Sequence, residues 1–117
     1  MRIHVIMPVL SDKMNGKIMR HLQSVASSET ELTISNVKSG PISIESMFDE
    51  EYCARPILEE ALYQRDRGVD GIIIYCFGNP AIEAAKEALD IPVIGIGEAS
   101  QTLSLPLSDQ FGIVTTV

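Results

Sequence analysis

A short apolar run, Ile72-Ile73-Ile74-Tyr75, constrains the fold of this chain more than any other feature. Alternate residues of a strand point to opposite faces of a sheet, and here both sets are apolar. Strands of this kind lie at the centre of parallel sheets that helices cover on both sides. The run opens after Asp70-Gly71 and ends at Cys76. We therefore expect an α/β domain with this segment as a buried strand.

Other β-prone segments alternate with segments of helical apolar spacing. Strands are predicted at 3–7, 32–37, 72–75, 91–96 and 111–117, and helices at 14–25, 45–52, 56–68, 80–89 and 98–105. Ser11 or Asp12 is placed to cap the first helix, while Pro56 and Pro80 suit the first turns of later helices. Strands that alternate with helices imply right-handed crossovers. The prediction is a flavodoxin-like three-layer sandwich with a parallel sheet in the strand order 2-1-3-4.

Composition limits the classes of partner. The 117 residues are 45% hydrophobic, which suits one domain, and the net charge of −7 repels nucleic acid and anionic membranes. No apolar run approaches the roughly 20 residues of a membrane span, and no signal peptide is recognisable. The two cysteines and two histidines have no neighbours at metal-ligand spacing. We expect a cytoplasmic protein that acts on a small molecule, without metal, nucleic acid or membrane.

In parallel sheets of this order, the ligand site lies beyond the carboxyl ends of the strands, near the switch between the first and third strands. The loops that meet there are predicted at 8–11, 76–79 and 97–100. The loop after the first strand contains no glycine, so it cannot form a dinucleotide-binding fingerprint. A nicotinamide or flavin cofactor is therefore not expected.

Cys76 is the residue in these loops best suited to chemistry. It ends the buried strand four residues before Pro80, where backbone N–H groups and the positive end of a helix favour a thiolate. Gly78 and Asn79 add amides that can form an anion-binding nest. The alternative is an ordinary apolar cysteine at a strand end. Cys53, within a helical stretch, is interpreted as structural.

Hydroxyl side chains at the predicted strand ends have two possible roles each. Ser11 is either part of the site or a helix cap. Thr115 and Thr116 close the last predicted strand, where a hydroxyl can reach a ligand, but threonine is also a common strand residue.

Two motifs then identify a family. They are Cys-Phe-Gly-Asn-Pro at 76–80 and Ile-Gly-Ile-Gly-Glu-Ala at 94–99, supported by Glu45-Ser46, Asp49-Glu50 and Phe-Gly-Ile-Val-Thr-Thr at 111–116. Together they resemble the aspartate/glutamate racemase superfamily, and within it the hydantoin and allantoin racemases, over nearly the whole chain. The resemblance implies a cofactor-independent racemase with two similar α/β lobes, each of which contributes one catalytic cysteine to the cleft between them.

The resemblance also assigns residues. Cys76 matches the first catalytic cysteine, and substrate contacts are expected from Pro8, Ser11, Phe77, Gly78, Asn79, Glu98, Ser100, Thr115 and Thr116. Many hydantoin racemases have Asn-Pro-Asn-Thr-Ser after the first strand, whereas this chain has Met-Pro-Val-Leu-Ser at 7–11. Most of the polar contacts expected from that loop are thus lost.

Members of the superfamily are about twice as long as this chain. We therefore expect residues 1–105 to form the first lobe, residues 106–117 to be a linker and the first strand of a second lobe, and the second cysteine to lie beyond Val117. Such a chain is expected to be inactive alone and to form a homo-oligomer. The alternatives are a non-catalytic module that binds a small anion or dimerises, and a decarboxylase or cis-trans isomerase of the same superfamily.

Overall fold

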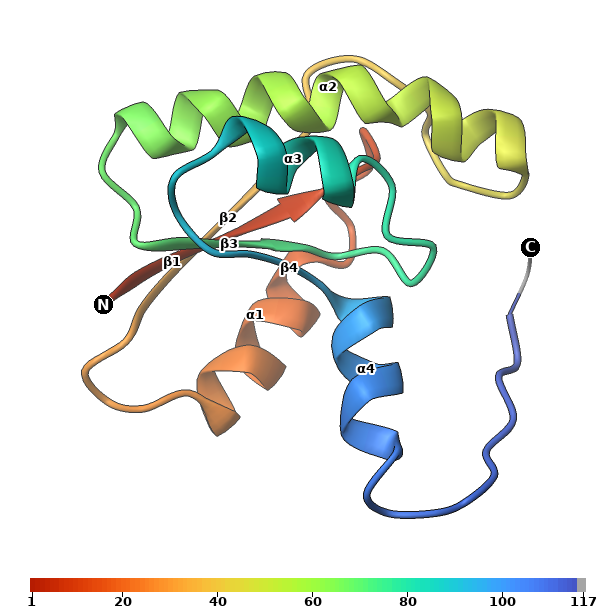
Figure 1. Cartoon of the computed structure of the whole chain (residues 1–117). Coiled ribbons are helices and arrows are strands. Elements are labelled where there is room, and N and C mark those ends of the chain that lie inside the picture. The colour runs from red at the N-terminus through yellow and green to blue at the C-terminus, as the bar shows by residue number, and fades with distance from the viewer. Residues whose placement is uncertain (116–117) are drawn as a thin grey trace.

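The computed structural model describes residues 1–115 and shows a parallel sheet between two layers of helices (Figure 1). The elements in chain order are β1 (Arg2–Met7), α1 (Asn15–Val25), β2 (Glu31–Asn36), α2 (Met47–Asp66), β3 (Gly71–Ile74), α3 (Ile82–Ala88), β4 (Val93–Gly95) and α4 (Ile96–Ser104). The strand order is β2-β1-β3-β4, and every neighbouring pair is parallel. The predicted fold class and strand order are confirmed.

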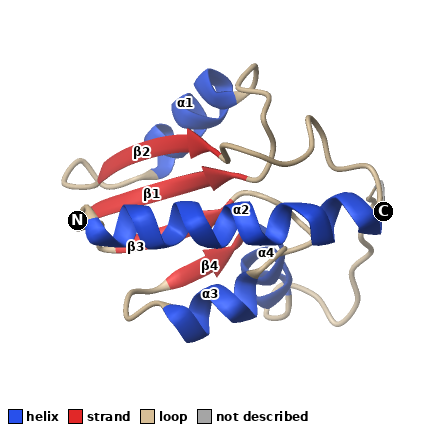
Figure 2. Ribbon diagram, turned by 90° about the horizontal axis from the view of Figure 1, so that it is seen from above, coloured by secondary structure: helices blue, strands red, loops and turns tan. Residues whose placement is uncertain are grey.

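The apolar run of the sequence forms β3, which pairs with β1 on one side and β4 on the other (Figure 2). Ile72 and Ile74 are buried, and Ile74 lies opposite Ile6 of β1 and Gly95 of β4. Because β3 is central, the residues that follow it emerge between the ends of its two neighbours. This register places Cys76 at the switch in strand order.

The main hydrophobic core lies between the sheet and the helices α2 and α3. Burial of apolar surface here supplies the main driving force for folding. Its members come from three strands, these two helices and the adjoining loops: Ile6, Val37, Cys53, Ile57, Ala61, Val69, Ile72, Ile74, Ile82, Ala85, Leu89 and Val93. Cys53 is fully buried within this core, as its helical surroundings predicted.

A polar cluster interrupts the apolar layer beneath α2. The buried ring of His4 is hydrogen-bonded to Thr33 Oγ1 at 2.7 Å and to Ser35 Oγ at 2.8 Å. Ser35 Oγ donates to Glu60 Oε1 of α2 at 2.6 Å. Burial lowers the pKa of His4, and the nearby Glu60 carboxylate offsets part of that effect. The cluster ties β1, β2 and α2 together with its buried polar groups satisfied.

Two helices predicted at 45–52 and 56–68 are one continuous helix, α2, and the predicted break at Pro56 is wrong. Proline removes one hydrogen bond within a helix and its ring crowds the preceding turn. In α2, however, the buried residues Cys53 and Ile57 pack into the core on either side of Pro56. This tertiary packing holds the helix together across the proline. Ser46 caps its first turn by accepting the N–H of Asp49 at 3.3 Å.

Three smaller boundaries also differ from the prediction. The first residue of α1 is Asn15 and its N-cap is Met14, without a side-chain hydrogen bond, so neither Ser11 nor Asp12 caps it. Helix α3 begins at Ile82 instead of at Pro80. β4 ends at Gly95 and α4 follows at once.

Beyond α4, the chain runs away from the sheet (Figure 1). Residues 105–115 carry several exposed apolar side chains. The strand predicted at 111–117 is not formed over 111–115, because no described strand lies beside this segment to pair with it; residues 116–117 lie outside the described part. None of the helices in residues 1–115 combines the length and apolar character that a membrane span requires.

Candidate functional site

Cys76 lies just beyond β3, where the carboxyl ends of β1, β3 and β4 meet. The N–H of Tyr75 donates to Ile6 O at 3.0 Å, which holds the chain against β1 up to that point. Cys76 itself is half-buried, and its carbonyl accepts the N–H of Asn79 at 3.2 Å. The backbone of Gly78 also hydrogen-bonds the thiol. The turn after β3 thus presents a partly exposed sulfur at the switch point.

The predicted thiolate is not favoured in this structure. Burial raises the pKa of the Cys76 thiol, the hydrogen bond from Gly78 lowers it, and the nearby carboxylate of Glu50 raises it further. The net direction is upward, opposite to the prediction. Helix α3 has only seven residues and begins at Ile82, so its positive end lies further along the chain than expected. Desolvation therefore outweighs the backbone donors.

The second thiol, Cys53, is closed to chemistry. It is fully buried, and burial raises its pKa to about 12, with a smaller contribution from Cys76. Its sulfur donates to Glu50 O at 3.1 Å within α2. A buried thiol with so high a pKa is inert at neutral pH.

Asn79 connects the Cys76 loop to α4. Its Oδ1 accepts the N–H of Gly97 at 3.1 Å and the N–H of Glu98 at 3.2 Å. The N-cap residue of α4 is Gly95, which has no side chain to fill this role, so Asn79 caps the helix from a neighbouring loop. The side-chain oxygen of Asn79 is thus used within the protein, and the predicted contact of Asn79 with substrate stays a prediction.

Glu98 is likewise engaged in the structure. Its Oε1 accepts the N–H of Gly95 at 3.1 Å, and its Oε2 lies 2.6 Å from Lys86 Nζ. The hydrogen bond with Lys86 lowers the pKa of Glu98 and raises that of Lys86. Glu98 therefore fixes the start of α4 and links it to α3, and its predicted contact with substrate stays a prediction.

Two glycines of the family motifs permit close approaches. A Cβ on Gly97 would overlap the carbonyl of Phe77 and lie 2.8 Å from Nδ2 of Asn79. A Cβ on Gly78 would overlap the carboxylate of Glu50 and lie 2.6 Å from its Cδ. Real Cβ atoms do not come so close. Because the neighbour of Gly97 is backbone, α4 can approach the Cys76 loop in this way only where residue 97 is glycine, whereas Gly78 leaves room for the side chain of Glu50.

The loop after β1 is held by a residue that sequence reasoning missed. Asn36, at the end of β2, donates from Nδ2 to the carbonyls of Val9 and Ser11, both at 2.8 Å. Its Oδ1 accepts from Asn15 Nδ2 at 2.6 Å. Pro8 is buried, and it is the carbonyl of Ser11 that is fixed here. A polar residue at the carboxyl end of a predicted strand was the available signal for Asn36.

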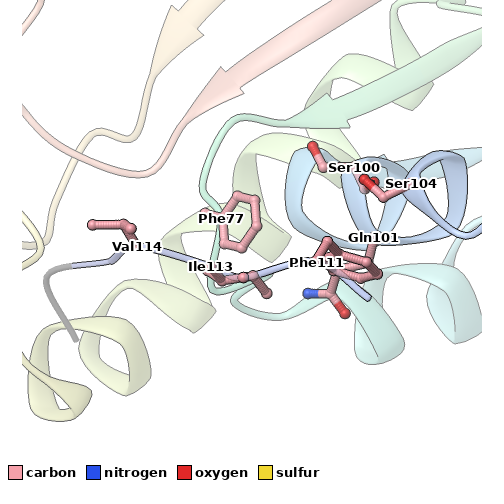
Figure 3. Close-up of a pocket in the computed structure, with 8 residues that line it drawn as sticks. Phe77, Ser100, Gln101, Ser104, Phe111, Ile113 and Val114 are labelled. Atoms are coloured by element: carbon pink, nitrogen blue, oxygen red, sulfur yellow. The ribbon is translucent and has the colours of Figure 1, made fainter. Parts of the chain in front are cut away.

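A cavity of about 260 Å³ opens beside the Cys76 loop (Figure 3). Its lining brings together Phe77 and Ser100, both predicted site residues, with Gln101 and Ser104 of α4 and residues 111–114. Ser100 Oγ donates to Ile96 O at 2.6 Å, so its proton is used within the helix. Gln101 and Ser104 were not predicted, because their place depends on where the C-terminal segment packs.

The remaining predicted residues do not line this cavity. Cys76, Pro8 and Ser11 are not among its lining residues, Thr115 follows the last of them, and Thr116 lies outside the described residues. Within residues 1–115, no group of three or more histidine, cysteine or acidic side chains is arranged to hold a metal ion.

The fold and the cysteine loop define a class of protein. The sequence profile of the Asp/Glu/hydantoin racemase family matches residues 3–117, and the chain belongs to this family. The predicted resemblance is thereby confirmed.

Individual relatives agree with this assignment. The chain is 38% identical over 117 residues to a hydantoin racemase of Pseudomonas sp. (strain NS671), a match that covers all of this chain and 47% of the relative. The structure is similar to the allantoin racemase from Klebsiella pneumoniae, with a TM-score of 0.85 and 39% identity over 90% of this chain and 43% of that one. It is also similar to the allantoin racemase from Pseudomonas fluorescens, with a TM-score of 0.87 and 25% identity over 95% of this chain and 47% of that one. The chain thus spans about half the length of the relatives it matches.

Proposed function

We propose that this chain is the amino-terminal lobe of a cofactor-independent racemase, in which Cys76 exchanges a proton with a carbon next to a carbonyl. The observation that carries the proposal is the position of the Cys76 thiol, half-buried at the switch point of a lobe that belongs to this family. The relatives are named as racemases of hydantoin and allantoin. The proposed substrate class is therefore cyclic ureides, with amino acids as the wider alternative.

The proposed reaction moves one proton off the carbon and another onto it. The Cys76 thiolate removes the proton from one face, and the electron pair of the C–H bond moves to the carbonyl to form an enolate. A second acid then protonates the carbon from the opposite face, which inverts it. In the reverse direction the Cys76 thiol is the acid. Its raised pKa keeps this thiol protonated at neutral pH and makes the thiolate a stronger base once it is formed.

The Gly78 N–H has a defined part in this scheme. Its hydrogen bond to the Cys76 sulfur favours the thiolate over the thiol, so it increases the fraction of protein in which Cys76 is deprotonated and ready to act as the base. The side-chain amide of Asn79, in contrast, is not proposed to contact substrate, because its Oδ1 already accepts two N–H groups of α4. Charge stabilisation of the enolate is assigned to backbone N–H groups of this loop other than those of Gly78 and Asn79, which already bind the sulfur and the carbonyl of Cys76.

We propose that the second acid comes from a second lobe beyond residue 117. Inversion needs a base on one face of the carbon and an acid on the opposite face. Cys53, the other thiol of this chain, is fully buried and cannot be the second group. The 117-residue chain alone is then expected to exchange substrate hydrogen slowly and without change of optical rotation. It is also expected to associate, because Leu103, Leu105, Leu107 and Val114 are exposed.

The test compares two cysteine variants of the longest natural protein that carries this chain. Cys76→Ser changes one atom, but a hydroxyl is far too weak an acid to supply the base, so racemisation of 5-methylhydantoin at neutral pH should be abolished in polarimetry. Cys53→Ser is the matched control, and the folded variant should keep the racemase activity. Near wild-type racemisation by Cys76→Ser would remove this residue from the mechanism.

A further inference from the structure

Glu50 is an acidic residue in the first turn of α2 whose side chain turns toward the Cys76 loop. It is half-buried, and its carboxylate covers the Cα of Gly78: a Cβ built there would overlap Oε1 and lie 2.9 Å from Oε2. Both carboxylate oxygens therefore face the turn that carries the reactive thiol.

The thiol and the carboxylate flank the same glycine. The backbone of Gly78 hydrogen-bonds the Cys76 sulfur, while Glu50 packs on the Cα of Gly78. The two groups are close enough that the charge of Glu50 acts on the titration of Cys76. A molecule that places its reacting carbon at the sulfur will therefore have its neighbouring atoms within reach of this carboxylate.

Among residues 1–115, Glu50 makes no side-chain hydrogen bond or ion pair. Two other acidic residues near the ends of helices differ in this respect. Asp49 Oδ2 accepts from Ser46 Oγ at 2.7 Å and from the N–H of Glu45 at 3.1 Å. Glu98 binds Lys86 and the N–H of Gly95. A half-buried carboxylate without a partner is unfavourable unless a donor completes it, and ionised carboxylates only accept hydrogen bonds.

We propose that Glu50 positions the substrate by accepting a hydrogen bond from the N–H on the atom attached to the stereocentre. This inference rests on the proposed function. Both substrate classes carry such a donor: N1–H of a 5-substituted hydantoin and the ammonium group of an amino acid. The same charge repels a substrate carboxylate, so a molecule must approach Glu50 with its nitrogen and present its carbonyl to the amides of the loop.

The experiment measures how well small molecules protect Cys76 from iodoacetamide, which needs no turnover. The probes are 5-methylhydantoin, its N1-methyl derivative 1,5-dimethylhydantoin, alanine and N,N,N-trimethylalanine, whose nitrogen carries no hydrogen. The proteins are the wild-type chain, Glu50→Gln, and Glu51→Gln as the matched control, since Glu51 is the exposed next residue of the same helix. Circular dichroism establishes that each variant is folded.

A hydrogen bond to a charged acceptor contributes about 1.5–3 kcal/mol, so N1-methylation should weaken protection of the wild type and of Glu51→Gln by about 10-fold or more. Glu50→Gln should bind 5-methylhydantoin about 10-fold more weakly and should lose most of the discrimination against the methylated compound. Protection by alanine but not by the hydantoin would assign the site to amino acids instead of ureides.

A second readout follows the thiol itself. The pH dependence of Cys76 alkylation should move to lower pH in Glu50→Gln, because a neighbouring negative charge is removed, and should stay unchanged in Glu51→Gln. Equal protection of Glu50→Gln and wild type by every probe that protects the wild type, or no protection of the wild type by any probe, would overturn the proposal. Absence of racemisation by the longest natural protein that carries this chain, with these protection differences intact, would instead contradict the proposed function alone.

Discussion

Replacement of Asn79 by alanine should separate the Cys76 loop from α4. The substitution removes the acceptor of two N–H groups, those of Gly97 and Glu98, and each such bond contributes about 1 kcal/mol net. It also places alanine at φ 56°, a left-handed conformation that asparagine tolerates and that costs other residues about 1–2 kcal/mol. The expected loss of unfolding free energy for Asn79→Ala is about 3 kcal/mol.

Two further substitutions separate these contributions. Asn79→Gly loses the same hydrogen bonds but adopts positive φ freely, so it should be destabilised by only about 2 kcal/mol. Asn79→Asp keeps an acceptor oxygen at the same place and adds a charge that the start of a helix favours, so its stability should stay within about 0.5 kcal/mol of the wild type. Gln23→Ala, on the exposed side of α1, is the control for a polar-to-alanine change without contacts.

The assay is urea unfolding followed by circular dichroism, with the slope of the transition compared across all four variants. Equal stabilities of Asn79→Ala and the wild type within about 0.5 kcal/mol would refute the capping role, because surface substitutions alone produce differences of that size. A loss in Asn79→Asp as large as that in Asn79→Ala would show that the acceptor oxygen is not what matters.

Three other outcomes follow from the structure. Gly97→Ala should destabilise the chain by about 1–3 kcal/mol, because its Cβ would overlap the backbone carbonyl of Phe77, and urea unfolding measures this directly. Burial lowers the pKa of His4 in the folded chain below 6.5. As the pH falls through 6.5, the unfolded chain therefore binds a proton that the folded chain does not, and the free energy of unfolding should decline. The decline should level off below the folded pKa of His4, which NMR titration of the ring measures. The raised pKa of Cys76 predicts an iodoacetamide rate that still increases above pH 9.0, while fully buried Cys53 stays unlabelled in peptide mapping until the chain unfolds.

The sheet could be predicted because its signals are local. The apolar run at 72–75 required a covered central strand, and the alternation of strands and helices required parallel pairing. Pro56 could not be interpreted in the same way, because the packing of Cys53 and Ile57 that carries α2 through it is tertiary. The segment 111–115 has a strand-like sequence, but a strand also needs a neighbour, which no described residue provides.

In the candidate site, too, the features set by local sequence could be predicted and those set by tertiary contacts could not. The position of Cys76 followed from the end of β3, whereas the direction of its pKa depends on burial and on Glu50, which lies 26 positions earlier in the sequence. Asn79 and Glu98 were assigned to substrate from the family motif, yet their side chains bind the start of α4. This capping role could not be predicted from the sequence, because it depends on the contact between the Cys76 loop and the start of α4. The contact is needed because Gly95 lacks a side chain that could cap this helix.

The most direct test of the two-sided proton transfer is the isotopic composition of both enantiomers early in a reaction in D₂O. The longest natural protein that carries this chain would be given one enantiomer of 5-methylhydantoin at neutral pD, and the enantiomers would be separated before one-tenth of the substrate is converted. If Cys76 removes the proton from one face and a second acid returns one to the other, the product should contain solvent deuterium while the recovered substrate keeps its original hydrogen. Deuterium in the recovered substrate at the same rate as in the product, or a product that retains the original hydrogen, would contradict the account.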